Sequence, residues 1–314
     1  MVDGLWTQTY CCSHSCFSNN WDTPIVDSLL PRNVLLMIPG NPGIAEYYLP
    51  FLTTVKSQLG PKLDIIAVSY PGFTANDHVL LSLKEQVDHK IALLDLLIDI
   101  YPDNTRFFIA GHSVGAYMAH QILKARPYSN ITRVISLFPT LHSMAVTPRA
   151  NQVAPLTNAF VRSCLVLIVF WLSFLPSAFL LPIAELVDGQ GGEDKRRILR
   201  LTVQKYLHSN VLNSALFLAN NEFKLIKELD KKAIDSHQER YIMYYSKTDG
   251  WTPLEDHYEL IKKEFPKVDL HLCEHDTDHA FVVSDSERMG HKVVEWLTPL
   301  ISLPFHSNKI SIVQ

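Results

Sequence analysis

The most informative stretch of this 314-residue chain is Arg106-Phe107-Phe108-Ile109-Ala110-Gly111-His112-Ser113-Val114-Gly115-Ala116-Tyr117-Met118-Ala119. Residues 107–110 are apolar, as in a short buried strand. Residues 111–115 match the pattern Gly-x-Ser-x-Gly, which forms a sharp turn between a strand and a helix and exposes the serine at its tip. Residues 116–119 include good helix formers. The stretch therefore predicts strand, turn and helix, with Ser113 as a candidate nucleophile.

The two glycines of this pattern have a steric role. The turn holds Ser113 in a strained backbone conformation, so the residues two positions before and after it must lack bulky side chains. Gly111 and Gly115 satisfy this requirement, and the following helix directs its N-terminus at the serine. The alternative is a glycine-rich turn with a buried, structural serine. The strand before the turn and the helix after it favour the nucleophile.

Length and composition favour one catalytic domain with an insertion. Hydrophobic residues make up 47% of the chain, which is enough for a large core. The formal net charge is −4, so no nucleic-acid partner is expected. The first thirty residues contain no Lys or Arg and no long apolar run. This predicts that there is no signal peptide and that the chain faces the cytosol.

The five cysteines form no clear metal or disulfide pattern. Cys11, Cys12 and Cys16 crowd the N-terminus, and none has a spaced partner elsewhere. A zinc site that includes His14 would lack the usual second pair of ligands. We therefore expect free thiols, and we predict neither a metal nor a cofactor.

Apolar runs and helical periodicity alternate along the chain. The predicted strands are Asn33–Ile38, Leu63–Tyr70, Phe107–Ala110, Ile131–Phe138, Glu239–Tyr245 and Val268–Cys273. The predicted helices, besides the one after Ser113, are Ala45–Leu59, Leu80–Ile100, Leu254–Phe265 and Ser286–Leu300. Strands that are apolar throughout and alternate with helices predict a doubly wound, mostly parallel sheet covered on both faces.

The strand pattern is interrupted once, and this divides the chain. The predicted segments are an uncertain N-terminal segment at 1–32, where Leu5–Tyr10 could form a strand, a first core part at 33–140, a helical cap without a clear strand at 141–236, a second core part at 237–302, and a tail at 303–314.

A serine nucleophile of this kind needs a base on a loop at the carboxyl end of a strand. His279 lies a few residues past the last predicted strand, as such a loop requires. It would take the Ser113 proton and return it to the leaving group. His275 is the alternative, but it lies too close to the strand end. His112 adjoins the serine, and its ring should point elsewhere.

The orienting carboxylate lies between the serine and the histidine in the α/β-hydrolase order. Asp249 follows the strand before the last one and falls where this acid belongs. The alternative is an ordinary turn aspartate before Gly250. Asp276 and Asp278 are weaker candidates because they lie too near His279 in sequence.

Backbone N–H groups should stabilise the oxyanion. One donor normally comes from the loop after the first clear strand, which here is Pro39-Gly40-Asn41-Pro42-Gly43. Pro42 has no N–H to give. We therefore predict that the Asn41 N–H and the Val114 N–H form the oxyanion hole. The alternative is a purely structural proline-glycine turn, and the loop can be both a tight turn and a source of an oxyanion donor.

The cap contains an uncharged run of 22 residues, Ser163–Ala184. About 20 apolar residues can span a bilayer, but Pro176 and Pro182 interrupt this run. A single crossing would also place Ser113 and His279 on opposite sides of the membrane. We therefore expect a hairpin or interfacial helix that inserts into one leaflet. The alternative is a buried cap helix of a soluble enzyme.

Taken together, the chain resembles the lipid droplet-associated hydrolase family over residues 33 to about 300. The resemblance rests on Ile38-Pro39-Gly40-Asn41-Pro42-Gly43 followed by Tyr47-Tyr48, on Gly111-His112-Ser113-Val114-Gly115-Ala116-Tyr117, on Leu137-Phe138-Pro139-Thr140, on Thr248-Asp249-Gly250-Trp251 and on His279-Ala280-Phe281. It implies an α/β-hydrolase fold, with Ser113, Asp249 and His279 as nucleophile, acid and base. It also implies residence on lipid droplets and endoplasmic reticulum, and a link to sterol-ester and neutral-lipid turnover.

The leading functional prediction is a serine esterase that cleaves lipid esters, such as sterol esters, at the droplet surface on its cytosolic face. Its partners would be the lipid ester, the droplet monolayer and the endoplasmic reticulum membrane. One alternative is a droplet-coating or recruiting protein with a weak or unused hydrolase site. Another is an acyltransferase that uses the same three residues.

Overall fold

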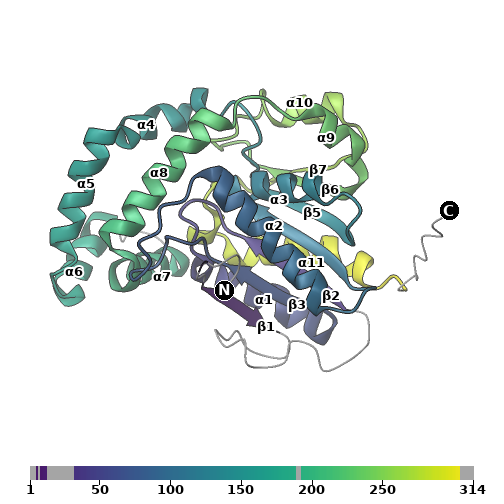
Figure 1. The fold of residues 1–314 in the computed structure, drawn as a ribbon, viewed down its shortest axis with the longest axis horizontal. Helices are drawn as coiled ribbons and strands as arrows, with labels where there is room; N and C mark the ends of the chain where they lie inside the picture. The colour runs from purple at the N-terminus through teal and green to yellow at the C-terminus, as the bar shows by residue number, and fades with distance from the viewer. Residues whose placement is uncertain (1–4, 6–7, 13–31, 189–191, 305–314) are drawn as a thin grey trace.

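The computed structural model describes residues 5, 8–12, 32–188 and 192–304 (Figure 1). Its centre is a seven-stranded sheet with the order β1-β3-β2-β4-β5-β6-β7. The strands are β1 (Thr9–Cys12), β2 (Asn33–Ile38), β3 (Asp64–Val68), β4 (Arg106–His112), β5 (Ile131–Leu137), β6 (Tyr241–Tyr245) and β7 (Asp269–Leu272). Strand β1 pairs antiparallel with β3, and the other pairs are parallel. The predicted mostly parallel sheet is confirmed.

Helices cover both faces of this sheet. Helices α1 (Leu49–Leu59) and α11 (Ser286–Ile301) pack together on one face, and α2 (Leu83–Ile100) and α3 (Val114–Ala125) lie on the other (Figure 1). Every residue of β2 and β3 is buried. After a polar first residue, Asn33 in β2 and Asp64 in β3, the strands are therefore continuously apolar instead of alternating.

Several observed boundaries differ from the predicted ones. Helix α2 begins at Leu83 rather than Leu80 because Ser82 and Glu85 form a reciprocal capping box. Strand β6 begins at Tyr241, since a 3-10 turn occupies Gln238–Arg240. Of the possible first strand at Leu5–Tyr10, the described part has a bridge at Leu5 and a strand at Thr9–Cys12 that continues past Tyr10, and residues 6–7 lie outside the described residues.

Other helices are also divided or shortened. A 3-10 turn at Ala45–Tyr48 precedes α1, and helix α10 covers only Tyr258–Glu264.

The insertion is helical in the part that the structure describes and contains no strand there. Its helices are α4 (Pro148–Thr157), α5 (Ala159–Leu172), α6 (Ser177–Asp188), α7 (Glu193–Leu201), α8 (Ser209–Leu225) and α9 (Lys231–Ser236), with a π-helical turn at Thr202–Tyr206. Helices α4, α5, α6 and α8 project to the left of the sheet in Figure 1.

The apolar run Ser163–Ala184 is divided between α5 and α6. The break falls at residues 173–176, which include Pro176. Pro182 lies inside α6 and does not end it, contrary to the expectation that both prolines interrupt the run. Among the described residues, no single helix is long and apolar enough to cross a bilayer, although α4 and α5, bent by 74°, meet the length and composition criteria as a pair.

The turn between β4 and α3 has the geometry that its two glycines predict. Ser113 has a φ of 55°, in the left-handed region that side-chain-bearing residues rarely adopt. A Cβ on Gly111 would lie 2.3 Å from the Gly115 carbonyl oxygen. A Cβ on Gly115 would lie 2.3 Å from the carbonyl oxygens of Ile38 and Pro39. The strain at Ser113 is therefore maintained by close packing of α3 on β2.

Replacing Gly115 should test this packing. We expect Gly115→Ala to lower the free energy of unfolding by about 1–3 kcal/mol, because overpacking forces backbone to move. Gly192→Ala is the matched control, since a Cβ there meets nothing within 4 Å, and its effect should stay within about 0.5 kcal/mol. Chemical denaturation measures both. Equal stability of the two variants would contradict the close approach.

Candidate functional site

Ser113 lies where β4 meets α3, at the carboxyl edge of the sheet. The residue is 9% exposed. The backbone N–H of Ser113 donates to the Leu137 carbonyl at 3.0 Å, which ties the turn to β5. The turn thus holds the hydroxyl at a fixed point beside the loops that follow β6 and β7.

Those two loops bring Asp249 and His279 to the serine. The Ser113 hydroxyl lies 2.8 Å from Nε2 of His279. Nδ1–H of the same ring donates to Oδ2 of Asp249 at 2.6 Å. Because the carboxylate accepts the hydrogen bond from Nδ1–H, Nε2 of the neutral ring carries no proton and can accept the serine proton. The geometry is that of a nucleophile, a base and an orienting acid.

Asp249 is held in its charged form. Burial raises the pKa of its carboxyl, but the His279 ring and hydrogen bonds from Thr252 and Trp251 outweigh burial, so the pKa lies below its ordinary value. The Trp251 N–H donates to Oδ1 at 2.7 Å and the Thr252 hydroxyl to Oδ2 at 2.7 Å. The hydrogen bond to His279 distinguishes Asp249 from an aspartate that only stabilises a turn.

The alternative residues lie elsewhere. Asp276 and Asp278 are exposed, and neither forms a side-chain hydrogen bond or ion pair with another described residue. His275 is exposed and lines a different pocket, between β7 and α11. The structure therefore brings His279 and Asp249, and not these residues, to Ser113.

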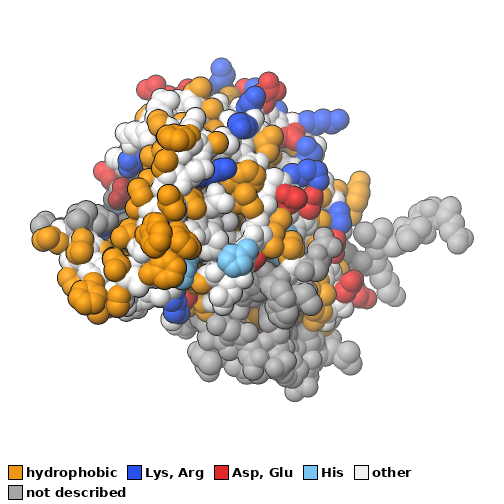
Figure 2. All heavy atoms as spheres, turned by 60° about the vertical axis from the view of Figure 1, so that its left-hand side comes forward, with side chains coloured by type: hydrophobic (Ala, Val, Ile, Leu, Met, Phe, Trp, Pro, Cys, Tyr) orange, Lys and Arg blue, Asp and Glu red, His pale blue; other side chains and the backbone are white. Residues whose placement is uncertain are grey.

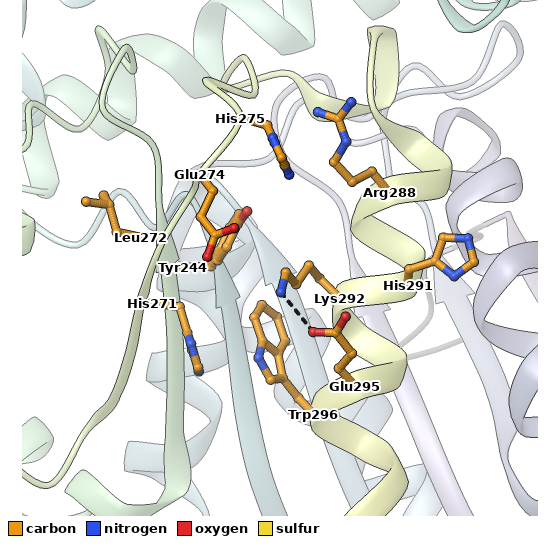
Figure 3. A pocket seen from close by; sticks show the side chains of 10 residues that line it. All are labelled: Tyr244, His271, Leu272, Glu274, His275, Arg288, His291, Lys292, Glu295 and Trp296. Atoms are coloured by element: carbon orange, nitrogen blue, oxygen red, sulfur yellow. Dashed lines mark hydrogen bonds and ion pairs between the residues drawn. The ribbon is translucent and has the colours of Figure 1, made fainter.

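The pocket beside His275 has a volume of about 280 Å³ and contains neither Ser113, Asp249 nor His279 (Figure 3). Lys292 and Glu295, both on α11, form an ion pair across its wall at 2.8 Å (Figure 3). Among the described residues, no group of three or more His, Cys, Asp or Glu side chains has the spacing of a metal site. Cys16 and His14, two members of the zinc alternative, lie outside the described residues.

Two backbone N–H groups are available near the serine. Val114 is the first residue of α3, so its N–H has no partner within the helix. The N–H groups of Asn41 and Val114 form no hydrogen bond with another described residue. The Gly40 N–H, by contrast, donates to the Tyr48 hydroxyl at 2.8 Å. Asn41 and Val114 therefore stay the candidate oxyanion donors.

The Asn41 side chain links this loop to the cap. Its amide donates to the Ala215 carbonyl at 2.9 Å and to Glu222 at 3.0 Å, both on α8. Burial raises the pKa of Glu222 to about 8, although the bond from Asn41 opposes this shift. The cap helix thus fixes the position of a candidate oxyanion donor.

A buried relay connects the oxyanion loop with the base. Nε2–H of His112 donates to the His279 carbonyl at 2.7 Å, so Nδ1 must accept, and it receives the Tyr48 hydroxyl at 2.6 Å. The Tyr48 oxygen in turn accepts the Gly40 N–H. Burial lowers the pKa of His112 to about 3, so the ring stays neutral and the relay is intact at ordinary pH.

Sequence reasoning missed the roles of Tyr48 and Glu222. Tyr48 belongs to a motif in the sequence, but no spacing rule connects it with His112, which lies 64 residues away. Glu222 lies on a helix face whose partner is 181 residues distant. An acidic residue among apolar neighbours on α8 was the one signal in the sequence that could have indicated it.

The acid can be tested by an isosteric change. Asp249→Asn should reduce ester turnover by several orders of magnitude, because His279 loses the acceptor that fixes its tautomer; a serine protease gives the scale of ~10⁴ for this change. Asp276→Asn is the control and should have little effect, since that side chain is exposed. Steady-state kinetics on a short soluble ester compare them. The reverse ranking would place the acid on the last loop.

The relay can be tested by removing one hydroxyl. Tyr48→Phe should lower kcat about 10-fold while KM for a short ester changes little. Without the hydroxyl, the buried Gly40 N–H and the His112 ring lose a hydrogen-bond partner. The loop that carries the oxyanion donor and the loop that carries His279 are then held less firmly. Tyr47→Phe is the control, since its hydroxyl instead bonds Thr202 in the cap at 2.7 Å. If the two variants have the same kcat and the same melting temperature, the relay has no positioning role.

Similar proteins from several animals all carry the same name. The chain is 28% identical over 287 residues to the lipid droplet-associated hydrolase of Rattus norvegicus, with 85% of each chain covered. It is 28% identical over 308 residues to that of Gallus gallus, with 92% of this chain and 93% of the other covered. The relative in Drosophila melanogaster is 28% identical over 304 residues, with 86% and 90% covered.

Solved structures share the fold at low identity. An esterase from Thermogutta terrifontis superposes with a TM-score of 0.58 at 14% identity, covering 86% of this chain and 91% of the other. A meta-cleavage product hydrolase from Pseudomonas fluorescens superposes with a TM-score of 0.60 at 16% identity, covering 95% and 96%. These similarities establish the α/β-hydrolase fold, as the family resemblance implied.

One family accounts for the fold, the relatives and the sequence motifs. The sequence model described as "Lipid-droplet associated hydrolase" matches residues 31–282, which include Ser113, Asp249 and His279. The match spans both parts of the sheet and the helical insertion between them. The chain belongs to the lipid-droplet associated hydrolase family.

Proposed function

We propose that the chain is a serine hydrolase that cleaves lipid esters, such as sterol esters or other neutral lipids, at a lipid droplet surface. The observation that carries this proposal is the continuous hydrogen-bond chain from Ser113 through His279 to Asp249. The family and the names of its relatives support a droplet-associated hydrolase.

The geometry supports the following reaction. As the Ser113 oxygen attacks the ester carbonyl, Nε2 of His279 takes its proton and Asp249 stabilises the imidazolium that forms. The Asn41 and Val114 N–H groups hold the oxyanion. Collapse of the tetrahedral intermediate breaks the bond to the alcohol, which leaves with the proton from His279. Water, activated by the same histidine, then hydrolyses the acyl-enzyme.

The surface of the cap supports attachment to a lipid surface. Hydrophobic side chains gather over it (Figure 2), and among the exposed ones are Phe160, Leu167, Ile168, Phe170, Trp171, Phe174, Leu175, Phe179 and Ile183. A patch of this extent on a soluble monomer marks an interaction site. A droplet offers a single leaflet of phospholipid over neutral lipid, which suits helices of this length.

The position of the site in the chain restricts how this cap attaches. Ser113 precedes α5 and α6, and His279 follows them, yet the two side chains are hydrogen-bonded. A cap segment that enters a leaflet must therefore leave by the same face. We propose this arrangement for the droplet and for the cytosolic face of the endoplasmic reticulum.

The nucleophile is tested with a matched serine. Ser113→Ala should lower turnover of a short soluble ester by at least about 10³-fold, because the acyl-enzyme cannot form. Ser143→Ala is the control: Ser143 also has a positive φ, of 54°, and its hydroxyl lies 3.0 Å from Nδ1 of His142. It should retain parental activity. Unchanged hydrolysis by Ser113→Ala would overturn the assignment of the nucleophile, whereas absence of hydrolysis by the parent would favour a recruiting protein.

Attachment is tested by making the cap polar. The combination Trp171→Ser, Phe174→Ser and Phe179→Ser should weaken binding to droplets at least about tenfold, since apolar burial contributes about 25 cal/mol per Å². Activity on emulsified lipid should fall, and activity on a soluble ester should not. Tyr128→Ser, which removes a 93% exposed aromatic outside the cap, is the control. Equal flotation of both with droplets would indicate that the cap does not attach.

A further inference from the structure

A groove of about 590 Å³ lies between α5 and α8. Its lining is Arg162, Ser163, Val166, Leu167, Phe170, Ser209 and Asn213. The lining divides into a polar end and an apolar end, and its α5 side is part of the hydrophobic cap. This groove takes no part in the mechanism above.

The polar end carries donors without partners. The side chains of Arg162, Ser209 and Asn213 form no hydrogen bond or ion pair with another residue in the described ranges. The guanidinium of Arg162 rests on the Phe217 ring, 5.3 Å from its centroid, which fixes its direction but leaves its N–H groups available.

Among the residues that the structure describes, no carboxylate forms an ion pair with this arginine. The sequence contains no Asp or Glu from Pro148 to Ala184, and Glu222 on α8 is engaged by Asn41. The pocket of Figure 3 differs, because its lysine and its arginine both have carboxylate partners: Lys292 pairs with Glu295 (Figure 3), and Arg288 pairs with Asp285. The groove therefore presents an unpaired positive charge and suits an anionic group.

The apolar end suits a hydrocarbon chain. Val166, Leu167 and Phe170 succeed one another along the α5 side of the groove. Phe170 also contacts Phe174, with ring centroids 5.1 Å apart, so the apolar end continues into the exposed face of the cap. A ligand that matches both ends has an anionic head and an acyl tail, and lies in a leaflet.

We propose that this groove binds one membrane phospholipid, with its phosphate on Arg162, Ser209 and Asn213 and an acyl chain along Val166, Leu167 and Phe170. A planar guanidinium matches phosphate with two parallel N–H donors. The inference rests on the proposed function, because the cap must lie at a lipid surface. Binding of the phospholipid headgroup would then set the depth and the rotation of the cap at the lipid surface.

The test compares two vesicle surfaces with the full-length protein. One is dioleoylphosphatidylcholine; the other is dioleoyl digalactosyldiacylglycerol, which has the same chains and no phosphate. Arg162→Gln should raise the Kd for phosphatidylcholine about tenfold, the scale of one charge-assisted hydrogen bond, and change the Kd for the galactolipid less than twofold. Arg149→Gln is the control, since Arg149 lies in the same cap, bonds Gln152 and is outside the groove.

Equal weakening on both surfaces, or equal weakening by Arg149→Gln, would overturn the headgroup site. Asn213→Leu is a second test variant, which should weaken binding to phosphatidylcholine and leave galactolipid binding intact. Weakened galactolipid binding with unchanged phosphatidylcholine binding would also overturn the headgroup site. The triple aromatic variant separates the two hypotheses. If it binds both vesicles like the parent, attachment by the cap fails. If it is released while Arg162→Gln binds phosphatidylcholine normally, only the phospholipid site fails.

Discussion

The hydrogen bond between Ser113 and His279 exists because parallel strands end at one edge of the sheet. Strands β4, β6 and β7 deliver Ser113, Asp249 and His279 from their carboxyl ends, and β2 delivers the Asn41 loop to the same edge. The cost is local strain at Ser113, which the close approach of Gly115 to β2 maintains. The order of the strands, the glycines of the turn and the geometry of the site therefore depend on one another.

The cap is attached to this edge by polar contacts as well as by packing. Asn41 bonds Ala215 and Glu222 on α8, and α8 packs against α5, which bears much of the exposed apolar surface. The exposed apolar helix α5 is thus two contacts away from a candidate oxyanion donor. Under the proposed function, the surface that holds the protein on a droplet and the loop that stabilises the reaction share one cap helix.

Much of this arrangement could be predicted from sequence because it follows local rules. The strands, the turn at Ser113 and the loop positions of Asp249 and His279 follow from hydrophobic runs and from the order of residues along the chain. The sequence predicts too early a start for α2, because apolar residues precede the capping serine, Ser82. The Tyr48 relay and the Glu222 contact depend on residues brought together by tertiary packing, which no periodicity encodes.

The central claim is that the strained turn and the His279–Asp249 pair make Ser113 the activated nucleophile. Mass-spectrometric mapping of the protein after reaction with a fluorophosphonate tests this most directly, because only an activated serine reacts readily. The account predicts an adduct on the peptide that contains Ser113, and its loss in His279→Gln under the same conditions. An adduct on another serine, or undiminished labelling of Ser113 without His279, would contradict it.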